Sequence, residues 1–127
     1  MSEIYVAGKI AGLEPELARD YFLNARKQLE DVGLAVITPY DIPACEEKGC
    51  NGAPDPYTAE LIEGGANDPR EYIHTWECYL RHDLAYVLHH CKGIAQLHNW
   101  MDSPGARLES YVGASCGLDV RAVQGWL

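Results

Sequence analysis

Short apolar runs alternate along this chain with longer segments of helical periodicity. The expected strands cover residues 4–7, 34–38, 93–98 and 118–123, and the expected helices cover residues 14–32, 72–90 and 104–116. Parallel pairing is the expected arrangement, because strands separated by helices join through right-handed crossovers rather than through tight hairpins.

Breaker residues and apolar stripes support this assignment. In the helix expected at residues 14–32, Pro15 suits the first turn and Gly33 suits the C-terminal cap. The segment 72–90 carries a second apolar stripe, which includes Val87. The sequence therefore predicts an α/β fold: a flavodoxin-like open parallel sheet of four to five strands, with helices on both faces.

Residues 41–70 interrupt the alternation. Prolines and glycines from Pro43 to Pro69 break any period, although residues 57–63 are compatible with one or two helical turns. Such a connection is a lid, a binding insertion, a partly disordered segment or a tolerated surface insertion, and the sequence leaves these alternatives open. We predict a single domain over residues 1–127, with an irregular insertion at about 41–70.

Charge and hydropathy narrow the range of partners. The net charge is −9 and the chain has no Lys/Arg cluster, which disfavours a nucleic-acid polymer as partner. A single phosphate group remains compatible, since backbone amides and hydroxyls can bind it. No apolar run approaches the roughly 20 residues that span a bilayer, and the N-terminus lacks a signal-peptide pattern. We expect a cytoplasmic protein without membrane contact.

The cysteines and histidines do not form a matched metal-binding pattern. The five cysteines are an odd number, which favours reduced thiols. Cys45 and Cys50 lie near His74 and Cys78 in sequence, but no second pair has matching spacing, so zinc is the less favoured alternative. The chain also lacks a P-loop and a G-x-G-x-x-G motif. We therefore predict no metal and no cofactor.

Polar residues cluster where the predicted strands end. The carboxyl ends of parallel strands share one edge of a sheet, so residues 5–8, 38–40 and 98–100 should surround one pocket. Asp83 and Glu109 should approach this pocket from helices. Two carboxylates, a phenol and several amides would make a catalytic group.

The three candidate catalytic residues each have an ordinary structural alternative. Glu109 is a candidate nucleophile or general base, or else an exposed helix glutamate. Asp83 would serve as an acid or an orienting group, or else would pair with Arg81 or Arg107 or simply be exposed. Tyr5 would donate a hydrogen bond to a carboxylate, or would be a core aromatic residue.

The candidate substrate contacts lie in the turns that follow the strands. Ser103 before a proline is a typical helix N-cap, and the same placement lets its hydroxyl and the amides of Gly105 and Ala106 hold an oxyanion. Gly8 would leave room at the end of the first strand. At the end of the third expected strand, Asn99 should face the pocket and Trp100 would stack on a base or cover the sheet edge.

Taken together, these segments resemble the nucleoside 2-deoxyribosyltransferase superfamily. The resemblance is carried by IYVAGKIAGL at 4–13, RHDL at 81–84, residues 93–100, SPGA at 103–106 and Glu109. It is nearest to the small phage and bacterial branch, often carried as a domain of unknown function. The superfamily has a flavodoxin-like fold and cleaves the N-glycosidic bond of 2′-deoxynucleosides or their 5′-monophosphates, passing the sugar to a second base or to water.

The resemblance implies roles for individual residues. Glu109 would be the nucleophile at the anomeric carbon, Asp83 would assist at the base, and Tyr5 would position the glutamate. Many transferases have an aspartate six residues before the nucleophile, whereas Ser103 is similar to the serine with which monophosphate hydrolases bind the 5′-phosphate. A deoxynucleoside 5′-monophosphate is thus the expected substrate, and a homo-oligomer is expected because neighbouring subunits often complete the pocket.

Two departures from the family pattern concern the base pocket. Many relatives have an aspartate after the cysteine before the third strand, where this chain has Cys91 and Lys92, and the insertion at 41–70 should cover or rebuild the pocket. Two rival functions stay open, because a fold does not determine a function. One is a module that binds or senses a nucleotide without turnover, and the other is a glycosidase acting on a ribosylated cofactor.

Overall fold

The computed structural model describes residues 3–42 and 76–127. Most of the expected insertion, including its predicted helical turns, lies outside the described residues. The chain divides into two compact units, residues 1–42 together with 86–127, and residues 43–85. The first unit carries the sheet and most of the candidate site residues.

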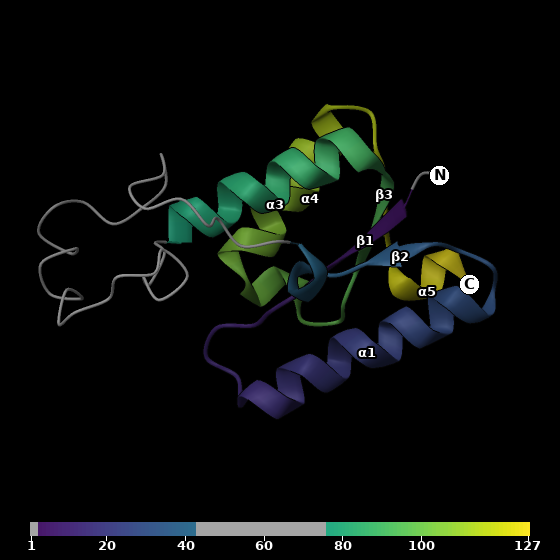
Figure 1. Ribbon diagram of the computed structural model, residues 1–127, viewed down its shortest axis with the longest axis horizontal. Helices are drawn as coiled ribbons and strands as arrows, with labels where there is room; N and C mark the ends of the chain where they lie inside the picture. Colours follow the sequence, from purple (N-terminus) through teal and green to yellow (C-terminus); the bar gives the residue numbers. More distant parts are fainter. Residues whose placement is uncertain (1–2, 43–75) are drawn as a thin grey trace, which may run out of the picture. The chain divides into compact units, whose positions relative to one another are not determined.

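Four parallel strands form the sheet of the first unit (Figure 1). They are β1 (Glu3–Ala7), β2 (Val36–Ile37), β3 (Cys91–Gln96) and β4 (Asp119–Ala122), in the spatial order β2-β1-β3-β4. Tyr5 in β1 pairs with Ile37 on one side and Ile94 on the other. The predicted α/β class, with a flavodoxin-like open parallel sheet, is confirmed.

Two helices cover one face of the sheet, α1 (Pro15–Asp31) and α5 (Val123–Trp126). Side chains alternate along a strand, so Ile4 and Val6 of β1 both point to this face. Phe22 and Leu29 of α1 pack against them with Val123 of α5, and all five side chains are buried. Burying each large apolar side chain contributes about 1.5–3 kcal/mol.

The opposite face is covered by α4 (Pro104–Ser115) and by the last turn of α3 (Trp76–His90). Tyr5 of β1 and Ile94 of β3 point to this side and pack with Ala106 of α4 and Val87 of α3. All four side chains are buried. Helices therefore cover both faces of the sheet, as the sequence predicts.

The chain reverses its direction across the sheet between β1 and β3. The connection that leaves β1 passes over the α1 face to β2, and the connection that leaves β3 passes over the α4 face to β4. In open α/β sheets such a switch point is where ligands bind. The amide of Leu97 donates to the carbonyl of Ala7 at 2.8 Å, so β1 and β3 stay paired up to this edge.

The C-terminal segment contains a short helix that the sequence analysis does not predict. The strand expected at residues 118–123 ends at Ala122, and α5 follows it directly. The indole N–H of Trp126 donates to the carbonyl of Ile94 at 3.1 Å. The ring fills the space over Gly93, where a Cβ atom would lie 2.4 Å from it. The short helix is packed by a tertiary contact of Trp126, which the local spacing of apolar residues does not predict.

Strand boundaries also differ from those predicted. β3 begins at Cys91 instead of residue 93, because Cys91 pairs with Glu3 next to a register shift in β1. The second strand, expected over five residues, is reduced to Val36–Ile37. Thr38, expected in that strand, instead caps the short 3-10 helix η1 (Pro39–Asp41).

Candidate functional site

Glu109 is a buried carboxylate on the sheet-facing side of α4. Its side chain is only 5% exposed, so the alternative of an exposed helix glutamate is wrong. The buried residues of α4 are Ala106, Glu109, Ser110 and Gly113, which follow the i, i+3, i+4, i+7 pattern of one helix face. Glu109 therefore occupies a position in this stripe that an apolar residue would ordinarily fill.

Tyr5 of β1 contacts Glu109 of α4. Its hydroxyl donates to Oε2 of Glu109 at 2.7 Å, within the distance of a charge-assisted hydrogen bond. The tyrosine is fully buried, because the alternation of β1 directs it under α4 together with Ala7. The structure thus brings together two predicted site residues that are 104 positions apart.

The N-terminus of α4 has the predicted cap. Ser103 Oγ accepts a hydrogen bond from the amide of Ala106 at 3.1 Å, and Pro104 occupies the first helical position. The N-cap prediction is confirmed. Because a hydroxyl both donates and accepts, the Ser103 O–H can still donate to an anion while the cap is formed. The positive end of the helix dipole favours a negative group at this terminus.

Asn99 links the loops that follow β1 and β3. Its Oδ1 accepts a hydrogen bond from the backbone amide of Lys9 at 3.0 Å, across the switch point. Gly8, predicted to leave room for substrate, has its space taken by Leu97: a Cβ atom at Gly8 would lie 2.4 Å from Leu97 Cδ1. The absence of a side chain at Gly8 therefore serves the close approach of these two segments.

Trp100 lies in the 3-10 helix η3 (Trp100–Asp102) and is partly buried. It lines a broad hollow of about 630 Å³ beside α4, together with Gln96 and Tyr111. It also lines a second hollow of about 340 Å³ beside α1. Glu109 lines neither of these two hollows, which are formed by described residues.

A hydrogen bond between Gln96 and Ser110 lies next to Glu109. Neither residue is among the site residues predicted from the sequence. Gln96 Nε2 donates to Ser110 Oγ at 3.1 Å, which connects the end of β3 to the residue next to Glu109. Ser110 is 6% exposed. The signal was present in the sequence, since Ser110 belongs to the same i, i+3, i+4 face of the helix as Ala106 and Glu109.

Asp83 lies on α3 within the other compact unit and is partly buried. Its predicted role at the base therefore depends on the family resemblance.

The candidate zinc ligands Cys45, Cys50 and His74 lie outside the described residues. Among the described residues, no group of three His, Cys, Asp or Glu side chains could hold a metal ion. No helix in the described ranges has the length and apolar character needed to cross a membrane.

Two titratable groups near the amino-terminal end of the sheet have raised pKa values. Burial raises the pKa of the Cys91 thiol to about 12, and the charge of Glu3 adds to this effect. A hydrogen bond to Glu3, at 2.7 Å, raises the pKa of the Tyr86 phenol to about 12. The raised pKa disfavours the thiolate, which is the reactive form of cysteine, and Cys91 packs in the core cluster beneath α4.

Comparison with known proteins yields one similarity. The model of a family described as a domain of unknown function (DUF4406) matches residues 61–122, nearly half of the chain. The matched range contains Asp83 and the segment from Asn99 to Glu109, but not Tyr5 or Gly8. No curated protein matches the chain. No solved structure matches it either.

Proposed function

We propose that this protein cleaves the N-glycosidic bond of 2′-deoxynucleoside 5′-monophosphates, with Glu109 as the nucleophile. The observation that carries the proposal is the buried Glu109 carboxylate, held by the Tyr5 hydroxyl at 2.7 Å under the N-terminal half of α4. A carboxylate is costly to bury and is retained inside a protein where its charge is used or compensated. The family resemblance supplies the substrate class.

The reaction has two steps. A Glu109 carboxylate oxygen bonds to C1′ while the C1′–N bond breaks, and the bonding electrons leave with the base, which takes up a proton. Water then attacks C1′ of the glycosyl-enzyme, gives up a proton and releases the carboxylate. A second base in place of water would complete a transfer instead of a hydrolysis. Positive charge develops on the sugar in both steps and is stabilised by the carboxylate.

Tyr5 orients the nucleophile in this proposal. Its hydrogen bond to Oε2 sets the plane of the carboxylate and reduces the number of rotamers that Glu109 can adopt. Asn99 acts at a distance, because its bond to the Lys9 amide holds the two loops of the switch point together. Asp83 is assigned to the departing base on the family resemblance alone.

Ser103 and the first turn of α4 form the phosphate site in this proposal. The Ser103 hydroxyl donates to a phosphate oxygen while it continues to cap the helix. The amide of Gly105 is among the N-terminal amides that have no partner within the helix. Such amides and the helix dipole together bind phosphate groups in many α/β proteins.

The direct test is release of free base from each of the four deoxynucleoside 5′-monophosphates, followed by chromatography. Wild-type protein should release base, and Glu109→Gln should lower the rate by about 10³-fold or more while nucleotide binding persists. Glu16→Gln is the matched control, because Glu16 is an exposed glutamate in the first turn of α1. It should leave the rate unchanged.

The rival functions give different outcomes in the same assay. If wild-type protein releases no base but is stabilised against heat by a nucleotide, the protein is a binding module and the catalytic proposal fails. Release of base from ribosylated cofactors but not from deoxynucleotides would show that the protein is a glycosidase acting on such cofactors. If Glu109→Gln releases base at the wild-type rate, Glu109 is not the nucleophile.

A further inference from the structure

The smaller hollow lies on the opposite face of the sheet from Glu109. It has a volume of about 340 Å³, and its floor is formed by the buried residues Ala25, Leu97 and Val123. These three belong to the core cluster beneath α1 and α5, whereas Tyr5 belongs to the cluster beneath α4. Gln96 and Trp100 line both this hollow and the one beside α4, whereas Glu109 lines neither of them.

The lining of this hollow carries no carboxylate, ammonium or guanidinium group. Its two titratable side chains are Tyr21 and His98, whose rings pack edge to face with centroids 4.7 Å apart. The described lining therefore offers a charged ligand no ion-pair partner. The protein's net charge of −9 further disfavours an anion.

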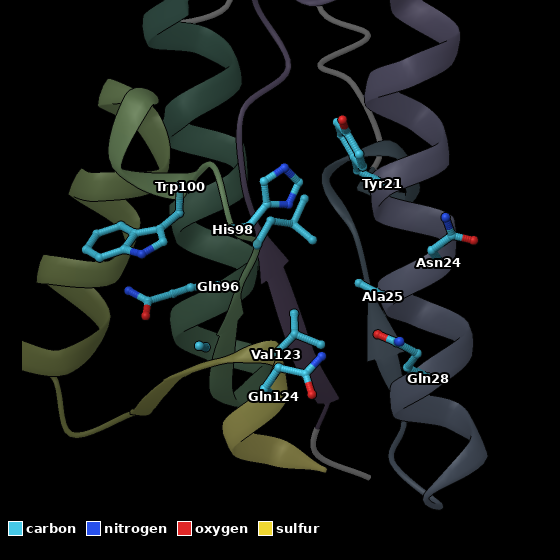
Figure 2. Close-up of a pocket in the computed structure, with 11 residues that line it drawn as sticks. Tyr21, Asn24, Ala25, Gln28, Gln96, His98, Trp100, Val123 and Gln124 are labelled. Carbon is cyan, nitrogen blue, oxygen red and sulfur yellow. The ribbon is translucent and has the colours of Figure 1, made fainter.

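Two carboxamides line the hollow from different helices. Figure 2 shows the amide groups of Gln28 from α1 and Gln124 from α5 pointing toward each other. Both residues are exposed, so their amides are open to a ligand or to water. Each carboxamide presents an N–H donor beside a C=O acceptor, the pattern that pairs with the edge of a nucleobase. Trp100 is also among the lining residues, although Figure 2 shows its ring directed away from Gln28 and Gln124.

We propose that this hollow is a second ligand site that binds an uncharged planar heterocycle of the nucleobase type. The volume lies in the range of small-molecule pockets, which combine an apolar lining with a few polar groups. In this site Gln28 and Gln124 form hydrogen bonds with the donor and acceptor atoms on the edge of the ring, and the buried residues Ala25, Leu97 and Val123 contact its face. This site goes beyond the proposed reaction and does not require Glu109.

Methyl NMR locates the bound ligand directly. Free adenine, hypoxanthine, uracil and thymine are titrated separately into Glu109→Gln protein, in which the proposed reaction is blocked. We expect at least one base to shift the methyl signals of Ala25 and Val123, which line the hollow, and not the signal of Ala106 on the α4 face. If every base leaves Ala25 and Val123 unmoved at millimolar concentration, or shifts Ala106 alone, the second site does not exist.

Two substitutions test the recognition itself. Gln28→Leu and Gln124→Leu preserve side-chain size and should each weaken base binding by about tenfold, the loss of about one hydrogen bond. Lys27→Leu, an exposed change next to Gln28 on α1, is the matched control and should leave binding unchanged. Equal binding by all four proteins would overturn the assignment. Base release from deoxynucleotides is measured in parallel, so failure of this site and failure of the proposed reaction are distinguishable.

Discussion

The contact between Tyr5 and Glu109 carries the functional argument. A buried carboxylate without a partner costs several kcal/mol, and a hydrogen bond from a buried phenol offsets part of that cost. Here both side chains are at most 5% exposed, and the bond between them is short at 2.7 Å. Burial and this short bond restrict the rotamers of both side chains, as the proposed attack of Glu109 on a sugar requires.

Tyr5→Phe tests this pair with the smallest possible change. Removing one hydrogen bond to a charged group should lower kcat for base release by about 10- to 100-fold and leave KM almost unchanged. Urea unfolding should show a loss of about 1–3 kcal/mol, because Glu109 stays buried with one bond fewer. A stability loss with unchanged kcat would assign the contact to folding alone.

Ser103→Ala separates capping from phosphate binding. Loss of the cap should destabilise the protein by about 1 kcal/mol, whatever the substrate. If the hydroxyl also binds phosphate, KM should rise by about tenfold or more for monophosphates and stay constant for the matching nucleosides. Ser103→Thr keeps the hydroxyl and should restore both properties. Equal effects on both substrate types would leave Ser103 as a helix cap only.

Among the secondary-structure elements, η1 is bound to α1 by the carboxylate of Asp41, in addition to the contacts of the Tyr40 ring with Phe22 and Arg19. Asp41 Oδ2 accepts hydrogen bonds from the Thr38 amide at 2.9 Å, the Thr38 hydroxyl at 3.0 Å and Arg26 at 2.7 Å. Burial raises the pKa of Asp41, but these hydrogen bonds and the Arg26 charge outweigh it and hold the pKa below its usual 3.8. The turn after β2 is thereby fixed against α1.

This carboxylate should make stability depend on pH in the acid range. Because the folded pKa of Asp41 is lowered, its stabilisation is complete above the unfolded value near 3.8 and disappears as the pH falls through the folded value. Asp41→Asn should cost about 0.5–1 kcal/mol at neutral pH, a modest figure because the pair is partly exposed.

Urea unfolding of both proteins at several pH values measures this effect. The difference between wild type and Asp41→Asn should vanish below the folded pKa, where both side chains are neutral. Asp20→Asn, an exposed change on α1, is the control. A difference that stays constant down to the lowest pH would contradict the assignment.

The molecule as a whole combines an open parallel sheet with a large negative charge. The reversal of strand order between β1 and β3 collects Tyr5, Asn99 and α4 at one edge. The net charge of −9 opposes the approach of a dianionic monophosphate, whereas the α4 N-terminus attracts it only at short range.

Ionic strength should therefore affect the two substrate classes differently. Raising the salt from about 0.01 M to 0.15 M shortens the Debye length from about 30 Å to about 8 Å and screens the long-range repulsion. We expect kcat/KM to increase for deoxynucleoside monophosphates and to stay constant for nucleosides. A decrease for the monophosphates would mean that local attraction outweighs the net charge.

Much of the architecture was predictable from local pattern. The spacing of apolar residues places α1 and α4 correctly, since period and caps are properties of neighbouring residues. The cap at Ser103 was predictable for the same reason. The identities of Glu109, Tyr5 and Asn99 as site candidates came from the rule that strand ends share one edge.

Other features were decided only when distant segments packed together. Helix α5 packs against the sheet with Trp126 over Gly93, and the space at Gly8 is taken by Leu97. The burial of Glu109 is of the same kind, because its sequence neighbours do not distinguish an exposed helix glutamate from a buried one. Local propensity acts over a few residues, whereas desolvation and close packing depend on what the rest of the chain brings into contact.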